Sequence, residues 1–127
     1  MKAIRGMKEE DLDELRVIHE KFYKEEFDFP NFCDKFLCSF IIQGDNNKIL
    51  CGGGVRLITE SMLITNKDFP VDERREAFLQ VLDASVFLTG KYGYNQLHAF
   101  VQDLSWERHL VKYGFETCKG RALVVNL

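Results

Sequence analysis

Residues 103–115 read DLSWERHLVKYGF and contain the start, the apolar side and the end of one short helix. Asp103 suits the start, because a carboxylate there accepts hydrogen bonds from the free amides of the first turn. The apolar side recurs at three- and four-residue spacing and consists of Trp106, Leu110 and Tyr113. The pair Gly114-Phe115 then ends the helix, since glycine readily leaves helical geometry.

The chain before this helix predicts a strand, a long helix and another strand. Residues 97–101 alternate between apolar and other side chains, as on a strand. A long helix is expected from about Glu73 to Tyr92, and a strand is expected before it at residues 62–65. The buried stripe of the long helix is expected to consist of Phe78, Val81, Leu82, Ser85 and Leu88. Because strand–helix–strand connections are right-handed crossovers, the two strands are expected to be parallel.

The N-terminal half predicts further strands and one or two helices. Residues 3–5 are expected to form a strand. A helix is expected to follow, with its first turn at residues 9–11 and its end at about Tyr23. A further helix is expected from about Asn31 to Phe36. A three-strand meander and two closing strands complete the prediction, at Cys38–Gln43, Lys48–Ile58, Met62–Thr65, Glu116–Cys118 and Ala122–Leu127. This order predicts one α/β domain over residues 1–127, with a mixed central sheet and helices on both faces.

Two turns are expected in this meander. Residues 44–47 read GDNN, and residues of these types tolerate left-handed backbone geometry. A tight turn is expected at residues 59–61. Three consecutive glycines, 52–54, interrupt the second strand and favour a bulge or a bend there. A phosphate cradle is the less favoured interpretation, because such a loop needs a helix directly after it and residues 55–58 continue as strand.

Composition excludes several classes of partner. The 127 residues are 46% hydrophobic and carry a net charge of -3, so the chain predicts a packed globule without the basic surface that nucleic acid requires. Residues 1–6 lack the apolar run of a signal peptide, and no stretch is long enough to span a membrane. We therefore expect a cytoplasmic protein, with no metal and with four reduced, mostly buried cysteines: Cys33, Cys38, Cys51 and Cys118.

The order of elements resembles the fold of the GCN5-related N-acetyltransferase (GNAT) superfamily over nearly the whole chain. Ile4-Arg5 followed by Glu10-Asp11-Leu12 is similar to that family's first strand and helix. Residues 49–53, ILCGG, are similar to its glycine-bearing third strand. Asp103 followed by residues 110–115, LVKYGF, resembles the family's Asn…Tyr-Glu-Lys-x-Gly-Phe.

The resemblance implies acetyl-CoA as cofactor and a set of residues that bind it. Ile64 and Thr65 correspond to the splayed strand that holds the pantetheine arm, and Asp103 to the Asn that approaches the cofactor. Arg74 and Arg75 correspond to the start of the long helix, where the family binds pyrophosphate. The family's two glycine positions are here filled by Ala77 and Leu79. Asp72 and Glu73 precede them, and their charge opposes phosphate at a helix start.

Acid–base residues of the family are only partly matched. The family's general acid is often a Tyr four residues before the Gly of Gly-Phe, and Leu110 stands there. Tyr113 lies three residues further on, roughly 60° away around the helix, so it is expected to pack in the core and not to replace the acid. Glu60 is the candidate general base, and a solvated turn residue is the alternative interpretation.

Two functions follow from the resemblance. The first is an acetyl-CoA-dependent N-acetyltransferase acting on an unidentified amine of a small molecule or protein. The second is a catalytically inactive protein of this fold with a structural or binding role, since small members with poor phosphate loops occur in bacteriophages, including as virion components. Five aromatic residues crowd the region where the family often shapes its acceptor pocket: Phe27, Phe29, Phe32, Phe36 and Phe40. An acceptor pocket, a homodimer contact or ordinary core would each explain them.

Overall fold

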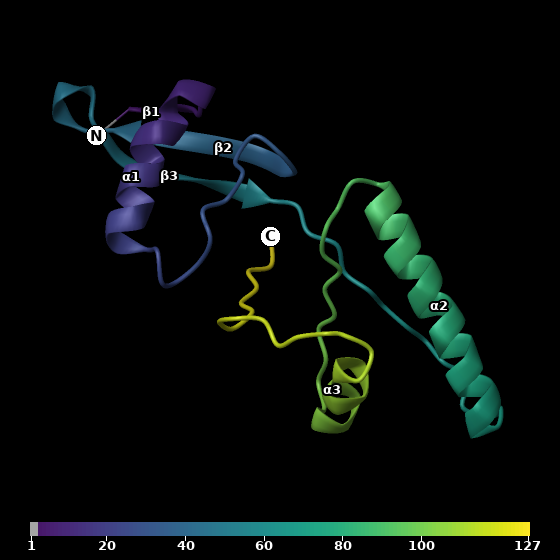
Figure 1. Ribbon diagram of the computed structural model, residues 1–127. Helices are drawn as coiled ribbons and strands as arrows, with labels where there is room; N and C mark the ends of the chain where they lie inside the picture. Colours follow the sequence, from purple (N-terminus) through teal and green to yellow (C-terminus); the bar gives the residue numbers. More distant parts are fainter. Residues whose placement is uncertain (1–2) are drawn as a thin grey trace. The chain divides into compact units, whose positions relative to one another are not determined.

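The computed structural model describes residues 3–127 as an α/β protein with a small antiparallel sheet and three α-helices (Figure 1). The chain divides into two compact units, Met1–Thr59 and Glu60–Leu127, and each is described by itself. The elements of the first unit are β1 (Ile4–Gly6), a 3-10 turn (Glu9–Asp11), α1 (Leu12–Phe22), β2 (Phe36–Gln43), a second 3-10 turn (Asp45–Asn47) and β3 (Ile49–Arg56). Those of the second unit are α2 (Val71–Lys91) and α3 (Leu104–Val111).

The sheet of the first unit has the strand order β1-β2-β3, and both pairings are antiparallel. Ile41 of β2 is completely inaccessible to solvent. It packs with Leu15 of α1 and Ile49 of β3, so that α1 covers one face of the sheet (Figure 1). Leu15 is the buried residue of α1, whereas Phe22 at the end of the helix is 62% exposed.

Glycines 52–54 lie inside a continuous strand, and the expected bulge at the glycines is wrong. The register is regular across Gly52, Gly53 and Gly54, and its irregularities fall on either side of them, opposite Leu37 and at Leu50. Two of the glycines are required by close packing. A Cβ at Gly52 would lie 2.6 Å from Cδ2 of Leu15, and one at Gly54 would collide with the carbonyl oxygen of Cys38.

Arg5 and Asp11 join the first strand to the first helical turn. Arg5 Nη1 and Nη2 donate to the two carboxylate oxygens of Asp11 over 2.8 and 2.7 Å, a bidentate geometry. The backbone N–H of Lys8 also donates to Asp11, over 2.7 Å. Arg5 Nε reaches across to Oε1 of Gln43 on β2 at 3.2 Å, so one arginine ties β1, β2 and the turn together.

The segment between α1 and β2 forms turns, and the helix predicted over residues 31–36 is wrong. The side chain of Asn31 accepts a hydrogen bond from the Cys33 N–H at 3.2 Å, which closes a local turn in competition with a helix. Lys35 has a φ of 59°, a left-handed conformation that no helix continues through. The expected left-handed geometry of residues 44–47 is confirmed, at Asn46 and Asn47.

The aromatic residues of this segment form a chain of ring contacts. Successive rings of His19, Phe29, Phe32 and Phe36 lie 5.0 to 5.8 Å apart, and the Arg16 guanidinium lies 4.5 Å above the Phe29 ring. None of the five phenylalanines named above is fully buried, and Phe27 and Phe40 are 47% and 42% exposed. Ordinary core packing therefore does not account for all of them.

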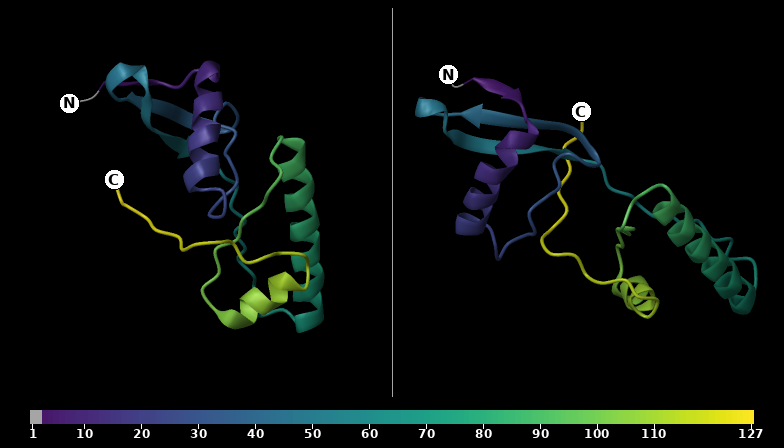
Figure 2. Two further views of the ribbon diagram at one scale, coloured as in Figure 1. Left: turned by 60° about the vertical axis from the view of Figure 1, so that its left-hand side comes forward. Right: turned by 45° about the horizontal axis from the view of Figure 1, so that its top comes forward.

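The second unit contains both remaining helices, and α3 lies beside the N-terminal half of α2 (Figure 2). The two helices meet where Phe78, the buried residue of α2, packs edge-on against Trp106 of α3 at 5.4 Å. Of the predicted α2 stripe, Val81 and Leu88 are 43% and 46% exposed, so only its first part is buried. Gly93 and Gly114 have φ values of 88° and 96° after α2 and α3, which confirms the predicted helix ends.

Four predicted strands are wrong among the described residues. Residues 62–65, 97–101, 116–118 and 122–127 belong to no strand, although His98 forms a single bridge, and Ile64 and Leu123 are 100% and 95% exposed. The sheet is accordingly antiparallel and small, in place of the mixed central sheet expected. Within residues 3–127 no helix is long and apolar enough to cross a membrane.

Candidate functional site

A cavity of about 530 Å3 lies within the Glu60–Leu127 unit. Its apolar wall comes from both helices and from the segments around them, and includes Met62, Leu63, Phe78, Phe100, Trp106 and Leu110. Its polar wall consists of Glu60, Ser61, Thr65, Lys67, Asp103 and Ser105. A mostly apolar hollow with a few polar groups is typical of small-molecule sites.

Two extended segments run parallel at one side of this cavity. Glu60 and His98 form a parallel bridge, and the Ser61 N–H donates to the His98 carbonyl at 2.7 Å. Among the described residues the pairing stops there, because neither 62–65 nor 99–101 belongs to a strand. Both of these stretches contribute residues to the cavity wall. The single bridge is parallel, the direction that was predicted for these segments, but the parallel strands expected at 62–65 and 97–101 do not form.

Three of the six residues expected at the cofactor site line this one cavity: Glu60, Thr65 and Asp103. Ile64 does not, because its side chain is 100% exposed. The expected tight turn at residues 59–61 is wrong, because Glu60 is held in the bridge. Glu60 therefore lies both in the bridge and in the cavity wall.

Asp103, which lines the cavity, also caps the N-terminus of α3. Its Oδ1 accepts a hydrogen bond from the Trp106 N–H at 2.7 Å, which is the predicted cap of α3. This bond also fixes the start of the helix that carries Ser105 and Trp106 into the cavity wall.

Arg74 and Arg75 lie on the first turns of α2 and do not line the cavity. Arg75 is exposed, whereas Nε of Arg74 is buried and has no hydrogen-bond partner among the described residues. The helix begins after Pro70, which provides no side-chain cap, and Asp72 and Glu73 occupy its first turn. The acidic first turn makes this helix start unfavourable for a phosphate group.

The helix position of the family's general acid is apolar here. Leu110 is buried, and its side chain lines the cavity. Tyr113 packs against the rings of Phe78 and His109, at 5.4 and 5.2 Å, and is not among the lining residues. The titratable residues of the cavity wall are Glu60, Lys67 and Asp103.

Some lining residues were not predicted from the sequence. Lys67, Ser105 and Trp106 belong to the wall of the cavity. Ser105 and Trp106 lie in the first turn of the helix that Asp103 caps, so the predicted cap could have pointed to them as neighbours of the site. Lys67 lies in an irregular segment, and no periodic pattern marks it.

None of the described cysteines is among the residues that line this cavity. The four cysteines are free, and Cys33, Cys51 and Cys118 are exposed, so the expectation of mostly buried thiols is wrong. Within residues 3–127, no three His, Cys, Asp or Glu residues gather as a metal would require.

Comparison with known proteins adds no family to these observations. No model of a known protein family matches the chain, and a search of curated proteins finds no match.

Proposed function

We propose that this protein is an acyl-CoA-dependent N-acyltransferase, with acetyl-CoA as the cofactor and an amine as the acceptor. The observation that carries the proposal is the parallel Glu60–His98 bridge, after which residues of both segments line the cavity without belonging to a strand. The backbone of such extended segments can pair with an extended amide-bearing chain such as pantetheine.

The cavity fits the acyl end of this cofactor. Phe78, Phe100 and Trp106 provide apolar surface beside the polar Thr65 and Ser105, and the volume of about 530 Å3 is in the range of small-molecule sites. When bound, acetyl-CoA supplies an activated acyl thioester. Backbone N–H groups near Thr65 would donate to the carbonyl oxygen on which negative charge develops.

Glu60 is the residue that we assign to proton removal. Its side chain is exposed and also borders the cavity, so it meets both solvent and ligand. An ammonium acceptor must lose a proton before it attacks a thioester, and a carboxylate at the cavity wall accepts that proton. Positioning of the two reactants supplies the remaining rate enhancement, since no tyrosine or histidine belongs to the cavity wall.

The start of α2 fits the phosphates of the cofactor poorly. Asp72 and Glu73 place two negative charges in its first turn, and the arginines that follow do not line the cavity. This observation favours a second candidate function, a non-catalytic binding or structural protein that uses the same fold, such as a virion component.

Thermal unfolding of the full chain with and without excess acetyl-CoA separates the two candidates. At about one hundred times the dissociation constant, ligand binding adds ~2.7 kcal/mol, and the melting temperature should rise on the order of 10 °C for a chain of this size. Dephospho-CoA is the matched control for the 3′-phosphate. An unchanged melting temperature at millimolar acetyl-CoA would reject the acyltransferase and leave the non-catalytic candidate.

The catalytic assignment is tested by Glu60→Gln. Acetyl transfer should fall about a hundredfold or more, as expected for loss of a general base, while the acetyl-CoA-induced rise in melting temperature is kept. Glu76→Gln is the matched control, because Glu76 is exposed on α2 and does not line the cavity. Full activity in the Glu60 variant would refute its role as base.

A further inference from the structure

A second cavity, of about 450 Å3, is bordered by α3 and by Lys112 at its C-terminal end. Its lining consists of Ser105, Trp106, Arg108, His109 and Lys112. No acidic residue belongs to this lining, so the wall offers hydrogen-bond donors and positive charge. Two features of this wall, its rigid aromatic base and its unpaired cations, indicate what it binds.

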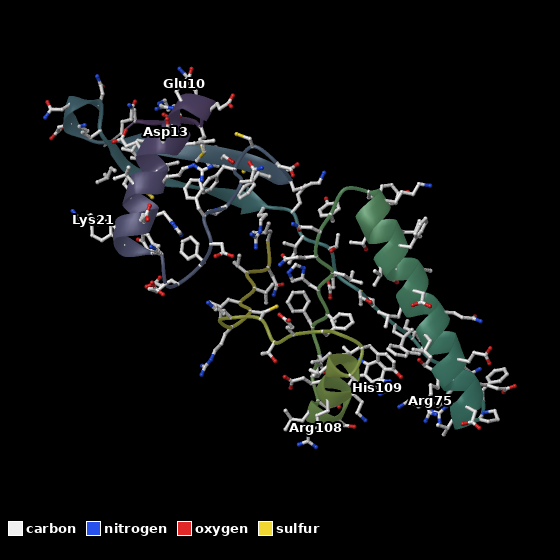
Figure 3. All side chains as sticks on the ribbon, viewed as in Figure 1. Glu10, Asp13, Lys21, Arg75, Arg108 and His109 are labelled. Carbon is white, nitrogen blue, oxygen red and sulfur yellow. The ribbon has the colours of Figure 1, made fainter. Side chains whose placement is uncertain are left out.

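The base of the second cavity is fixed by ring packing. The His109 ring stacks on Trp106 with centroids 5.0 Å apart and an interplanar angle of 22°. The same ring also lies 5.1 Å from Phe78 and 5.2 Å from Tyr113. Figure 3 shows His109 on the side of α3 that faces α2, and Arg108 directed away from that helix. The His109 ring is thus packed against three other rings, those of Trp106, Phe78 and Tyr113.

Arg108 and Lys112 stand four residues apart, which brings two positive side chains together on one helix surface. Both are exposed, and neither forms an ion pair within residues 3–127. The neighbouring carboxylates have other partners: Asp103 accepts from the Trp106 N–H, and Glu107 accepts from the Thr117 hydroxyl at 3.3 Å. Like charges at this spacing repel, and an anion between them removes the repulsion.

Ser105 and Trp106 belong to the walls of both cavities. One ligand can therefore place an apolar arm in the larger cavity and an anionic group in the second. The acidic first turn of α2 does not offer an equivalent anion site.

We propose that Arg108 and Lys112 bind a phosphate or pyrophosphate group in the second cavity. This assignment rests on the proposed function. The site holds the pyrophosphate of the acyl-CoA cofactor, a role that the start of α2 would otherwise have. Ser105 contributes a hydroxyl donor, and the arginine provides the forked geometry that matches phosphate oxygens.

Inorganic pyrophosphate is the direct probe of this site. Trp106 is the one tryptophan of the chain and lines the second cavity, so its fluorescence reports the titration, with calorimetry as an independent measurement. Pyrophosphate should bind saturably and more weakly at high salt. Arg108→Gln and Lys112→Gln should each weaken binding about tenfold, the effect of one charge-assisted hydrogen bond. Lys119→Gln should leave it unchanged, because Lys119 is exposed and lines neither cavity.

Acetyl-CoA in the same titration separates failure of this inference from failure of the proposed function. Weaker acetyl-CoA binding in both cation variants, with Lys119→Gln unaffected, would support the whole proposal. Pyrophosphate binding that depends on both cations, without any acetyl-CoA binding, would support the phosphate site and reject the acyltransferase. Unchanged acetyl-CoA affinity in both variants would overturn the assignment of this site to the cofactor's pyrophosphate and leave the acyltransferase intact. No saturable pyrophosphate binding by calorimetry would overturn the phosphate site itself.

Discussion

The glycines of β3 differ in how much room the structure leaves for a side chain. A Cβ on Gly54 would collide with the Cys38 carbonyl and lie 3.0 Å from Cα of Ser39, whereas one on Gly53 would meet nothing within 4 Å. Gly54→Ala should therefore lower the free energy of unfolding by about 2 kcal/mol, as overpacking against backbone does. Gly53→Ala is the matched control and should cost nothing, because alanine is favoured over glycine in a strand interior. Urea unfolding followed by circular dichroism measures both, and equal losses would contradict the packing argument.

Asp11 makes the first unit sensitive to acid. The hydrogen bonds from the Arg5 guanidinium lower the pKa of this carboxyl from 3.8 to about 2, assisted by the Lys8 N–H and opposed by burial. Because the folded pKa is lower than the unfolded one, the stabilisation is complete above pH of about 4 and is lost as the pH falls toward 2.

Asp11→Asn should accordingly unfold at a lower temperature than the wild type at pH 7, and the difference should shrink between pH 4 and pH 2. Asp13→Asn is the matched control, because it makes the same change on an exposed side chain two residues along. Melting temperatures across this pH range provide the measurement. A constant difference between Asp11→Asn and wild type would show that the carboxylate charge is not what stabilises the turn.

At the scale of elements, α3 depends on its cap. Asp103→Ala removes the acceptor of the Trp106 N–H and should destabilise the helix by about 1 kcal/mol. Asp103→Asn keeps a capping oxygen without the charge and should recover most of this loss. Chemical unfolding followed by Trp106 fluorescence, which reports α3 itself, measures the effect. If Asn were as destabilising as Ala, the charge of Asp103 and not its hydrogen bond would stabilise the helix.

Helices and strands differed in how well their sequences predicted them. The bounds of α1, α2 and α3 lie within a few residues of expectation, because periodic stripes and caps such as Asp103 act locally. Residues 31–36 were misassigned because the Asn31 side chain and the left-handed Lys35 form turns there. Residues 62–65 and 122–127 have the β-branched composition of strands, yet a strand forms only where another strand pairs with it.

At the scale of the whole molecule, the proposed site belongs to one of the two units. Every residue that lines the larger cavity comes from Glu60–Leu127. Acetyl-CoA should therefore slow amide hydrogen exchange in α3 and in residues 60–65 and 97–101, and leave the core of β2 around Ile41 unchanged. Exchange mass spectrometry with and without ligand tests this, with dephospho-CoA as the control. Protection confined to residues 4–56 would place the ligand elsewhere and contradict the site.

The sequence by itself determined the features that arise within a few residues of one another. These are the helix ranges, the Asp103 cap, the left-handed turn at residues 46–47 and the parallel direction of the segments at Glu60 and His98, the last from the handedness of crossovers. Tertiary structure alone decided that Gly52 and Gly54 lie close against Leu15 and Cys38, and that Thr65 belongs to the cavity wall while Ile64 does not. Such features depend on distances between residues far apart in the chain, which no local pattern encodes.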